Sequence, residues 1–303
     1  MQQPRLESVI CPHPDGQHRM AWWSWGDAAA EHVVVCVHGL TRQGRDFDRL
    51  AQALVQRAAA PIRIVCPDVA GRGHSDWLPR SELYQIPQYA SDMLALLAQL
   101  QQHAPIRTLD WVGTSMGGLI GMVLAGQARL PLPAALRRLV LNDVGPAITW
   151  ASIERMQQFV GRYGQFASLE AAAAELRRVS TGFGPVPDDI WLALCAPMVR
   201  ALPDGALTLH YDPAIAEPIR ALTPEAAQAA EAVVWALYDQ IRAQVLLVRG
   251  QESDLLTEDT AQAMTLRGPK ARLLQWPGVG HAPTLTDPAH IDALANFLLG
   301  NPA

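Results

Sequence analysis

The sequence predicts an α/β protein with a mostly parallel, doubly wound sheet. Two observations favour this class: short, continuously apolar runs, typical of strands buried on both faces, and helix-like segments between them. The alternation implies right-handed crossovers between parallel strands. Strands are expected at Arg19–Trp25, His32–His38, Ile62–Asp68, Leu109–Gly113, Arg138–Asp143, Gln244–Gly250 and Ala271–Pro277. Helices are expected at Asp46–Ala58, Ile86–His103, Met116–Gly126, Thr257–Leu266 and Pro288–Leu299.

The alternation of strands and helices breaks after Asp143. Residues 145–238 are mostly helix-like, and turn signals such as "GFGPVPDD" interrupt them. The strand pattern resumes at Gln244, so we expect a helical cap at 145–238 inserted into a core formed by residues 1–144 and 239–303. Within the cap, helices are expected at Ile153–Tyr163, Leu169–Val179, Asp188–Ala196 and Glu225–Leu237.

The amino-acid composition excludes some classes of protein and favours others. The chain has 303 residues, of which 50% are hydrophobic and 17% charged, so a large core is available. A net charge of −5 without a Lys/Arg cluster argues against nucleic-acid binding. Four scattered cysteines and the lack of a signal peptide indicate a reduced, cytoplasmic protein, and no apolar run is long enough to span a membrane.

No motif indicates a cofactor or a metal. "GRGHSD" follows an expected strand and begins like a dinucleotide fingerprint, but its third glycine is absent and no strong helix pattern follows. The sequence also lacks a P-loop, an H-E-x-x-H motif and paired C-x-x-C motifs. We therefore expect neither a bound cofactor nor a metal ion.

A serine turn is the strongest chemical signal. "GTSMG" fits G-x-S-x-G, and it lies between an expected strand and an expected helix, the context in which such a turn holds a serine nucleophile exposed. The alternative is a packing joint with an incidental serine. The strand before the motif and the helix after it favour Ser115 as a nucleophile.

A serine nucleophile needs a base, and the base needs an acid. His281, in the loop "PGVGHAPTL" after the last expected strand, is the best-placed histidine. For the acid, "RGQESDLLT" offers Asp254, which we prefer, and Glu252; Asp143, at the end of "LVLND", is a third option. The order Ser115, Asp254, His281 is the one expected for a G-x-S-x-G hydrolase.

The loop "HGL" at the end of an early strand completes the expected site. Backbone N–H groups of Leu40 and of Met116, the residue after the serine, are expected to form the oxyanion hole. The candidates for the substrate pocket are His38, Trp77 and Tyr211. We also expect His38 to hold its loop through side-chain hydrogen bonds.

These motifs together resemble the α/β-hydrolase fold superfamily, in its capped, single-domain, esterase-like branch. The resemblance covers nearly the whole chain and rests on "HGL", "DVAGRGHS", "GTSMGG", "RGQESDLL" and "GVGHAP". It implies a structural role near the site for Asp68, Gly71, Gly73 and Ser75. Many members place the acid three residues after the glycine that ends the strand; here that position is Ser253, one before Asp254, which keeps Glu252 open.

The function expected is hydrolysis of a carboxylic ester through an acyl-enzyme intermediate. The substrate is expected to be a small molecule, and the mostly apolar cap favours an apolar acyl part. Carbon–carbon bond hydrolases, lactonases and acyltransferases share this triad and stay open as alternatives. A binding protein on the same fold is a more remote alternative, because pure binding does not require all three roles at once.

Overall fold

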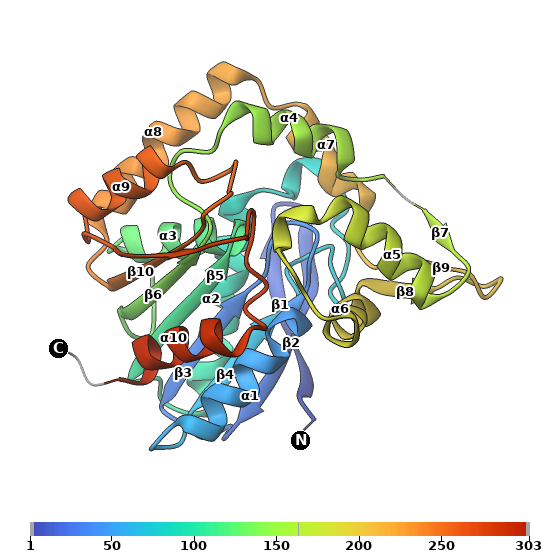
Figure 1. Cartoon of the computed structure of the whole chain (residues 1–303). Coiled ribbons are helices and arrows are strands. Elements are labelled where there is room, and N and C mark those ends of the chain that lie inside the picture. The colour runs from blue at the N-terminus through green and yellow to red at the C-terminus, as the bar shows by residue number, and fades with distance from the viewer. Residues whose placement is uncertain (1–2, 163, 301–303) are drawn as a thin grey trace.

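An eight-stranded sheet forms the centre of the computed structural model, which describes residues 3–162 and 164–300. The strand order is β1-β2-β4-β3-β5-β6-β10-β11 (Figure 1). β1 and β2 are antiparallel to their neighbours, and all other neighbouring pairs are parallel. The strands are β1 (Arg5–His13), β2 (Gly16–Gly26), β3 (His32–Val37), β4 (Arg63–Pro67), β5 (Thr108–Thr114), β6 (Leu136–Asn142), β10 (Gln244–Gly250) and β11 (Arg272–Trp276).

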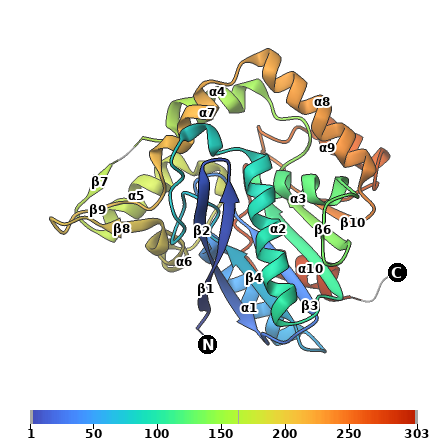
Figure 2. The same cartoon turned by 180° about the vertical axis from the view of Figure 1, so that it is seen from behind.

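Helices cover both faces of the sheet (Figures 1 and 2). Alternate residues of β3 serve opposite faces: Val33 and Val35 pack with α2 and α3, whereas Val34 packs with α1 and α10. Both faces are therefore apolar, which explains the continuously apolar strands. The helices of the two faces are α1 (Asp48–Arg57) and α10 (Pro288–Leu299) on one side, and α2 (Ile86–His103), α3 (Met116–Gly126) and α9 (Glu258–Leu266) on the other.

The sequence does not predict the edge strand β1. Only Val9 and Cys11 of this strand are buried, and Pro12 lies near its end. The strand is ordered by antiparallel pairing with β2 rather than by a continuous apolar run. Its weak sequence pattern is typical of an edge strand with one wetted face. The other seven strands of the sheet and the five helices on its faces lie where the sequence predicts them.

The segment between β6 and β10 contains helices and a second, small sheet. Its α-helices are α4 (Trp150–Phe159), α5 (Leu169–Val179), α6 (Asp188–Cys195), α7 (Ala216–Arg220) and α8 (Pro224–Gln240). The sequence analysis expects a mostly helical segment and does not predict the small sheet, in which β7 (Gln165–Phe166), β9 (Leu207–Leu209) and β8 (Val199–Ala201) pair antiparallel. Strands of two or three residues are too short to leave a periodic pattern.

Two boundaries in this segment differ from expectation. The first cap helix ends at Phe159, and Tyr163, the end of its expected range, lies outside the described residues. The C-terminal part of α8 packs closely on α3, since a Cβ at Gly126 would lie 2.4 Å from the Leu237 carbonyl oxygen. The C-terminal end of this segment therefore packs on the core. The expected boundaries between core and cap, after residue 144 and after residue 238, stay predictions. Short 3-10 helices lie at Gly44–Phe47, Ser81–Leu83, Thr181–Phe183, Ala196–Met198 and Pro213–Ile215.

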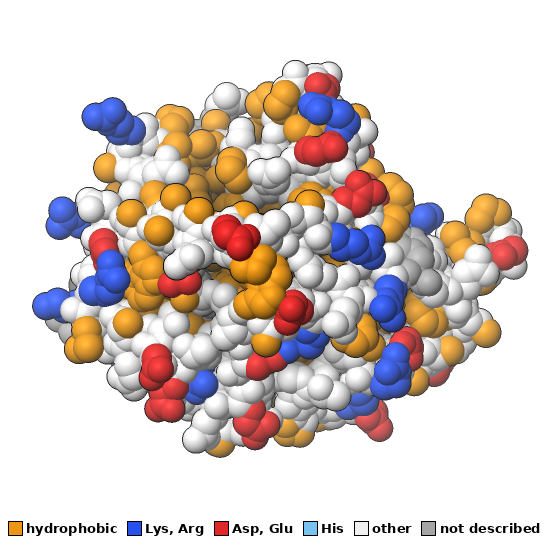
Figure 3. Space-filling model, turned by 90° about the horizontal axis from the view of Figure 1, so that it is seen from above, with side chains coloured by type: hydrophobic (Ala, Val, Ile, Leu, Met, Phe, Trp, Pro, Cys, Tyr) orange, Lys and Arg blue, Asp and Glu red, His pale blue; other side chains and the backbone are white. Residues whose placement is uncertain are grey.

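The face formed by α4, α7 and α8 is shown from above in Figure 3, with apolar side chains gathered between scattered acidic and basic ones. Val233, in α8 (Pro224–Gln240), is 60% exposed. Within the described ranges, no helix is both long and apolar enough to cross a bilayer.

Candidate active site

A strained turn holds Ser115 at the carboxyl end of β5. Its φ of 51° and ψ of −114° lie outside the regions that most residues adopt. The turn needs glycine on both sides: a Cβ at Gly113 would lie 2.3 Å from the Gly117 carbonyl oxygen, and one at Gly117 would lie 2.0 Å from that of Val37. The glycines therefore permit a bend that presents the Ser115 hydroxyl at the start of α3.

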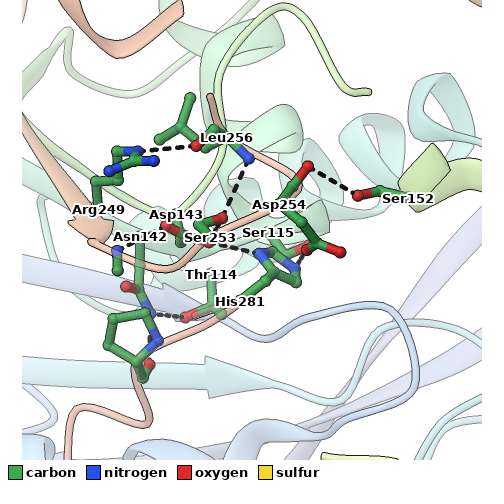
Figure 4. A network of polar contacts seen from close by, with 12 residues as sticks. Thr114, Ser115, Asn142, Asp143, Ser152, Arg249, Ser253, Asp254, Leu256 and His281 are labelled. Carbon is green, nitrogen blue, oxygen red and sulfur yellow. Dashed lines mark hydrogen bonds and ion pairs between the residues drawn. The ribbon is translucent and has the colours of Figure 1, made fainter. Parts of the chain in front are cut away.

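His281 lies against Ser115, as the sequence predicts. Its Nε2 atom is 3.0 Å from Ser115 Oγ, and its Nδ1 atom is 2.7 Å from Asp143 Oδ2 (Figure 4). The three residues follow β5, β6 and β11, three parallel strands of the sheet. Their carboxyl ends share one edge, which is where open α/β sheets bind ligands.

The Asp143 carboxylate is completely buried and accepts three hydrogen bonds. Gly250 N–H donates to Oδ1 at 2.8 Å, while Ser253 Oγ–H at 2.6 Å and the ring of His281 donate to Oδ2. Because a carboxylate only accepts, His281 carries its proton on Nδ1, and Nε2 is free to accept a proton from Ser115. This tautomer suits a base that serves a serine nucleophile.

The preference for Asp254 as the partner of His281 is wrong in this structure. The Asp254 side chain is 51% exposed and forms an ion pair with Arg155 of α4. Its carbonyl oxygen accepts a hydrogen bond from Ser152 (Figure 4) and a second one from Thr149. The loop after β10 thus turns this carboxylate toward the segment between β6 and β10. Glu252 is also exposed, whereas Asp143, the third option, contacts the histidine.

Ser253 helps to hold the acid of the triad, Asp143, at the end of β6 rather than in the loop after β10. It occupies the position where the resemblance places the acid, and its hydroxyl donates to Asp143 Oδ2. The carboxylate is thus supplied by the end of β6, and a serine at the usual position holds it. The sequence carried a signal for this arrangement: a serine replaced the expected acid, and a second acid followed a neighbouring parallel strand.

The loop after β3 is fixed by His38. Val69 N–H donates to Nε2 at 2.9 Å, so the ring proton is on Nδ1, which donates to the Gly39 carbonyl oxygen at 2.7 Å. Burial lowers the pKa of His38 to about 3, and the positive charges of Arg72 and Arg42 act in the same direction. His38 is therefore neutral, and its bonds hold the loop as expected. It is completely buried and offers no nitrogen to a substrate.

The peptide between Gly39 and Leu40 gains its orientation from these contacts. Its carbonyl oxygen is held by His38 and by Arg42 N–H at 3.1 Å. In a trans peptide the N–H points opposite to the C=O, so the Leu40 N–H faces away from His38. Gly39 lies beside Ser115, since a Cβ on this glycine would be 3.8 Å from Ser115 Cβ. Met116 opens α3, whose first N–H groups have no partner within the helix.

Trp77 and Tyr211, the other two candidates for the substrate pocket, differ in their burial and in their contacts. Trp77 is 44% exposed, and the guanidinium of Arg200 stands 5.7 Å from its ring centre. Tyr211 is buried; its hydroxyl accepts a hydrogen bond from Gly161 N–H at 3.2 Å, and its backbone forms a β-bridge with Arg72. These contacts give Trp77 a surface position and Tyr211 a role in joining the inserted segment to the core.

The Alpha/beta hydrolase family matches the chain over residues 34–291. The chain belongs to this family. A 3-hydroxybutyrate-oligomer hydrolase from Cupriavidus necator is 45% identical over 300 residues, which are 98% of each chain. An alpha/beta hydrolase from Novosphingobium aromaticivorans is 33% identical, covers 98% of this chain and 99% of its own, and has a TM-score of 0.82. A Rickettsia typhi protein is 26% identical over 99% of this chain and 100% of its own, with a TM-score of 0.85.

The expected fold and family are thereby confirmed. The hydrolase has the mostly parallel sheet, with helices on both faces, that the sequence predicts. The class of reaction is confirmed as well, because the full-length similarity to an ester-cleaving relative makes this chain an ester-cleaving hydrolase.

Proposed function

We propose that the hydrolase cleaves carboxylic esters through Ser115, His281 and Asp143, with an acyl-enzyme intermediate. The observation that carries the proposal is the continuous contact from Ser115 Oγ through both ring nitrogens of His281 to Asp143 Oδ2, at 3.0 and 2.7 Å. Three groups in hydrogen-bond reach, in this order, form a nucleophile, a base and an orienting acid.

In the first half-reaction, Ser115 Oγ attacks the ester carbonyl while His281 Nε2 accepts the serine proton. The N–H groups of Leu40 and Met116 stabilise the oxyanion, and the imidazolium is stabilised by Asp143. His281 then donates the proton to the leaving alcohol, which breaks the ester bond and leaves the acyl group on Ser115. Water, deprotonated by the same nitrogen, releases the acid and restores the hydroxyl.

We propose short oligomers of 3-hydroxybutyrate, or of a similar small hydroxy acid, as the substrate class. The support is the similarity to the Cupriavidus necator enzyme over 98% of both chains. In such a substrate the leaving alcohol is the hydroxyl of the next unit, and the acyl group on Ser115 is one short hydroxyacyl unit or a chain of them. The substrate stays a small molecule, in agreement with the sequence analysis.

The test measures hydrolysis of the linear 3-hydroxybutyrate dimer and trimer beside short-chain and long-chain aryl esters. We expect turnover of the oligomers and of the short-chain esters, complete loss in Ser115→Ala, and phosphonate labelling at Ser115. Short-chain ester turnover without oligomer turnover would contradict the substrate class alone. An unlabelled Ser115 and no ester turnover would contradict the mechanism. Location in the cytoplasm stays a prediction.

A further inference from the structure

Arg72 is a completely buried cation that the triad does not use. It lies in the turn Gly71–Gly73, and its guanidinium donates to three oxygens: Leu40 O at 2.8 Å, Ala70 O at 2.7 Å and Tyr89 Oη at 2.9 Å. The rings of Tyr89 and Tyr84 lie 5.0 and 5.8 Å from it. Among the described residues, no carboxylate forms an ion pair with this guanidinium.

Burying a cation without a counter-ion costs free energy of folding. The groups that hydrogen-bond to this guanidinium therefore indicate what Arg72 does in the protein. Two of its contacts are with the two residues of the expected oxyanion hole. Nε donates to the carbonyl oxygen of Leu40, and Nη2 lies 3.5 Å from Met116 Sδ. One planar guanidinium therefore contacts both the loop after β3, through the Leu40 backbone, and the start of α3, through the Met116 side chain.

Building on the proposed function, the geometry points to Arg72 as a positioning residue that fixes Leu40 and Met116 and places its positive charge behind the oxyanion. His38 holds the peptide on the N-terminal side of Leu40 through Gly39 O, and Arg72 holds the peptide on its C-terminal side through Leu40 O. With both sides fixed, the Leu40 N–H keeps its direction while the negative charge forms. The buried site screens the guanidinium little, so its charge favours the oxyanion over the neutral ester.

Backbone hydrogen bonds from the segment between β6 and β10 hold the turn that contains Arg72. Gly73 N–H donates to His210 O at 3.0 Å, and Asp212 N–H donates to Gly71 O at 2.8 Å. The carboxylate of Asp212 accepts a hydrogen bond from Tyr84, whose ring packs near Arg72. Docking of residues 210–212 therefore supports the Arg72 position and, through it, the oxyanion loop.

The test compares Arg72→Lys and Tyr89→Phe with wild type. Arg138→Lys is the matched control: Arg138 is also buried and also donates to carbonyl oxygens, those of Leu298 and Gly300, but it lies at the start of β6, at the other end of the strand from Asp143. Rates on a short-chain aryl ester are divided by the number of sites that a phosphonate titrates, so that unfolded protein does not count.

We expect kcat per titrated site to fall about 10- to 100-fold in Arg72→Lys, with KM changed by less than about threefold. Lysine keeps the positive charge but loses the planar guanidinium that holds Leu40 O, and the orientation of the Leu40 N–H matters mainly in the transition state. Tyr89→Phe, which leaves the charge but removes one anchor, should lower it about three- to fivefold. Arg138→Lys should lower the melting temperature and leave kcat per site unchanged.

A wild-type kcat per site in Arg72→Lys, with wild type active and labelled at Ser115, would overturn the role of Arg72 and leave the proposed function intact. An equal fall in Arg138→Lys would reduce Arg72 to a structural residue and overturn the role as well. A wild-type enzyme without turnover or labelling would overturn both proposals. If Arg72→Lys does not fold, Tyr89→Phe decides: an unchanged kcat per site there overturns the role.

Discussion

Replacing Asp143 by asparagine tests the assignment of the acid. Asp143 accepts from the rigid Gly250 N–H through Oδ1, and from Ser253 and His281 through Oδ2. An asparagine keeps only one acceptor oxygen. The Gly250 N–H is fixed at the end of β10, so the amide oxygen takes the Oδ1 position and the amide N–H₂ faces His281 Nδ1. His281 must then move its proton to Nε2, where it can no longer accept one from Ser115.

The expected loss follows from this wrong tautomer. In a serine protease triad the same change lowers kcat by about 10⁴, which corresponds to about 5.5 kcal/mol of transition-state stabilisation at 1.36 kcal/mol per tenfold. We expect a loss of this order in Asp143→Asn. The matched control is Asp254→Asn, whose carboxylate is half exposed and pairs with Arg155. Because exposed ion pairs contribute little, its kcat/KM should stay within about threefold of wild type.

The assay is kcat/KM on a short-chain aryl ester, with circular dichroism to show that each variant is folded and phosphonate titration to count sites. An Asp143→Asn enzyme within tenfold of wild type would refute the assignment. The assignment would also be refuted if kcat/KM of a folded Asp254→Asn enzyme fell more than a hundredfold, because the acid of the triad would then lie in the loop after β10.

Four further predictions concern neighbouring features. Ser253→Ala removes one donor to Asp143 Oδ2 and should lower kcat about 5- to 10-fold in steady-state assays, and an unchanged kcat would contradict a supporting role. Gly117→Ala drives a Cβ into the Val37 carbonyl oxygen and should lower the free energy of unfolding in urea by about 3 kcal/mol or more; a loss below about 1 kcal/mol would show that the elbow tolerates a side chain. The pKa of His38 is about 3 in the folded protein, below the value of about 6.5 expected for the unfolded chain. Between about pH 6.5 and pH 3, the unfolded chain therefore binds more protons than the folded protein. Each pH unit of acidification in this window lowers the free energy of unfolding by up to about 1.4 kcal/mol. Urea unfolding of His38→Gln should therefore depend less on pH in that window, and an equal slope would contradict the assignment. Burial raises the pKa of Cys66 and raises that of Cys195 to about 11, so iodoacetamide at neutral pH should label neither in native protein and both in denaturant, as read by mass spectrometry; labelling of the native thiols would show that they open to solvent.

The sequence by itself determined the elements whose signals are local. The glycines around Ser115 must be close in the chain, because the bend spans only a few residues, and so the elbow was readable. Continuously apolar runs identified seven of the eight strands of the main sheet, because parallel strands are buried on both faces. Position after the last strand was enough to select His281, since loops at the carboxyl ends of strands converge on one edge.

Only the tertiary structure decided which acid meets the histidine. Asp143 and His281 are 138 residues apart, and their contact depends on how the loops after β6, β10 and β11 bend. Three carboxylates followed two neighbouring strands, and a shift of one residue in the loop after β10 turned Asp254 outward and Ser253 inward. The place of Arg72 was hidden for the same reason: its partners Leu40, Tyr89 and Met116 come from three separate segments, which only the folded chain brings around one guanidinium.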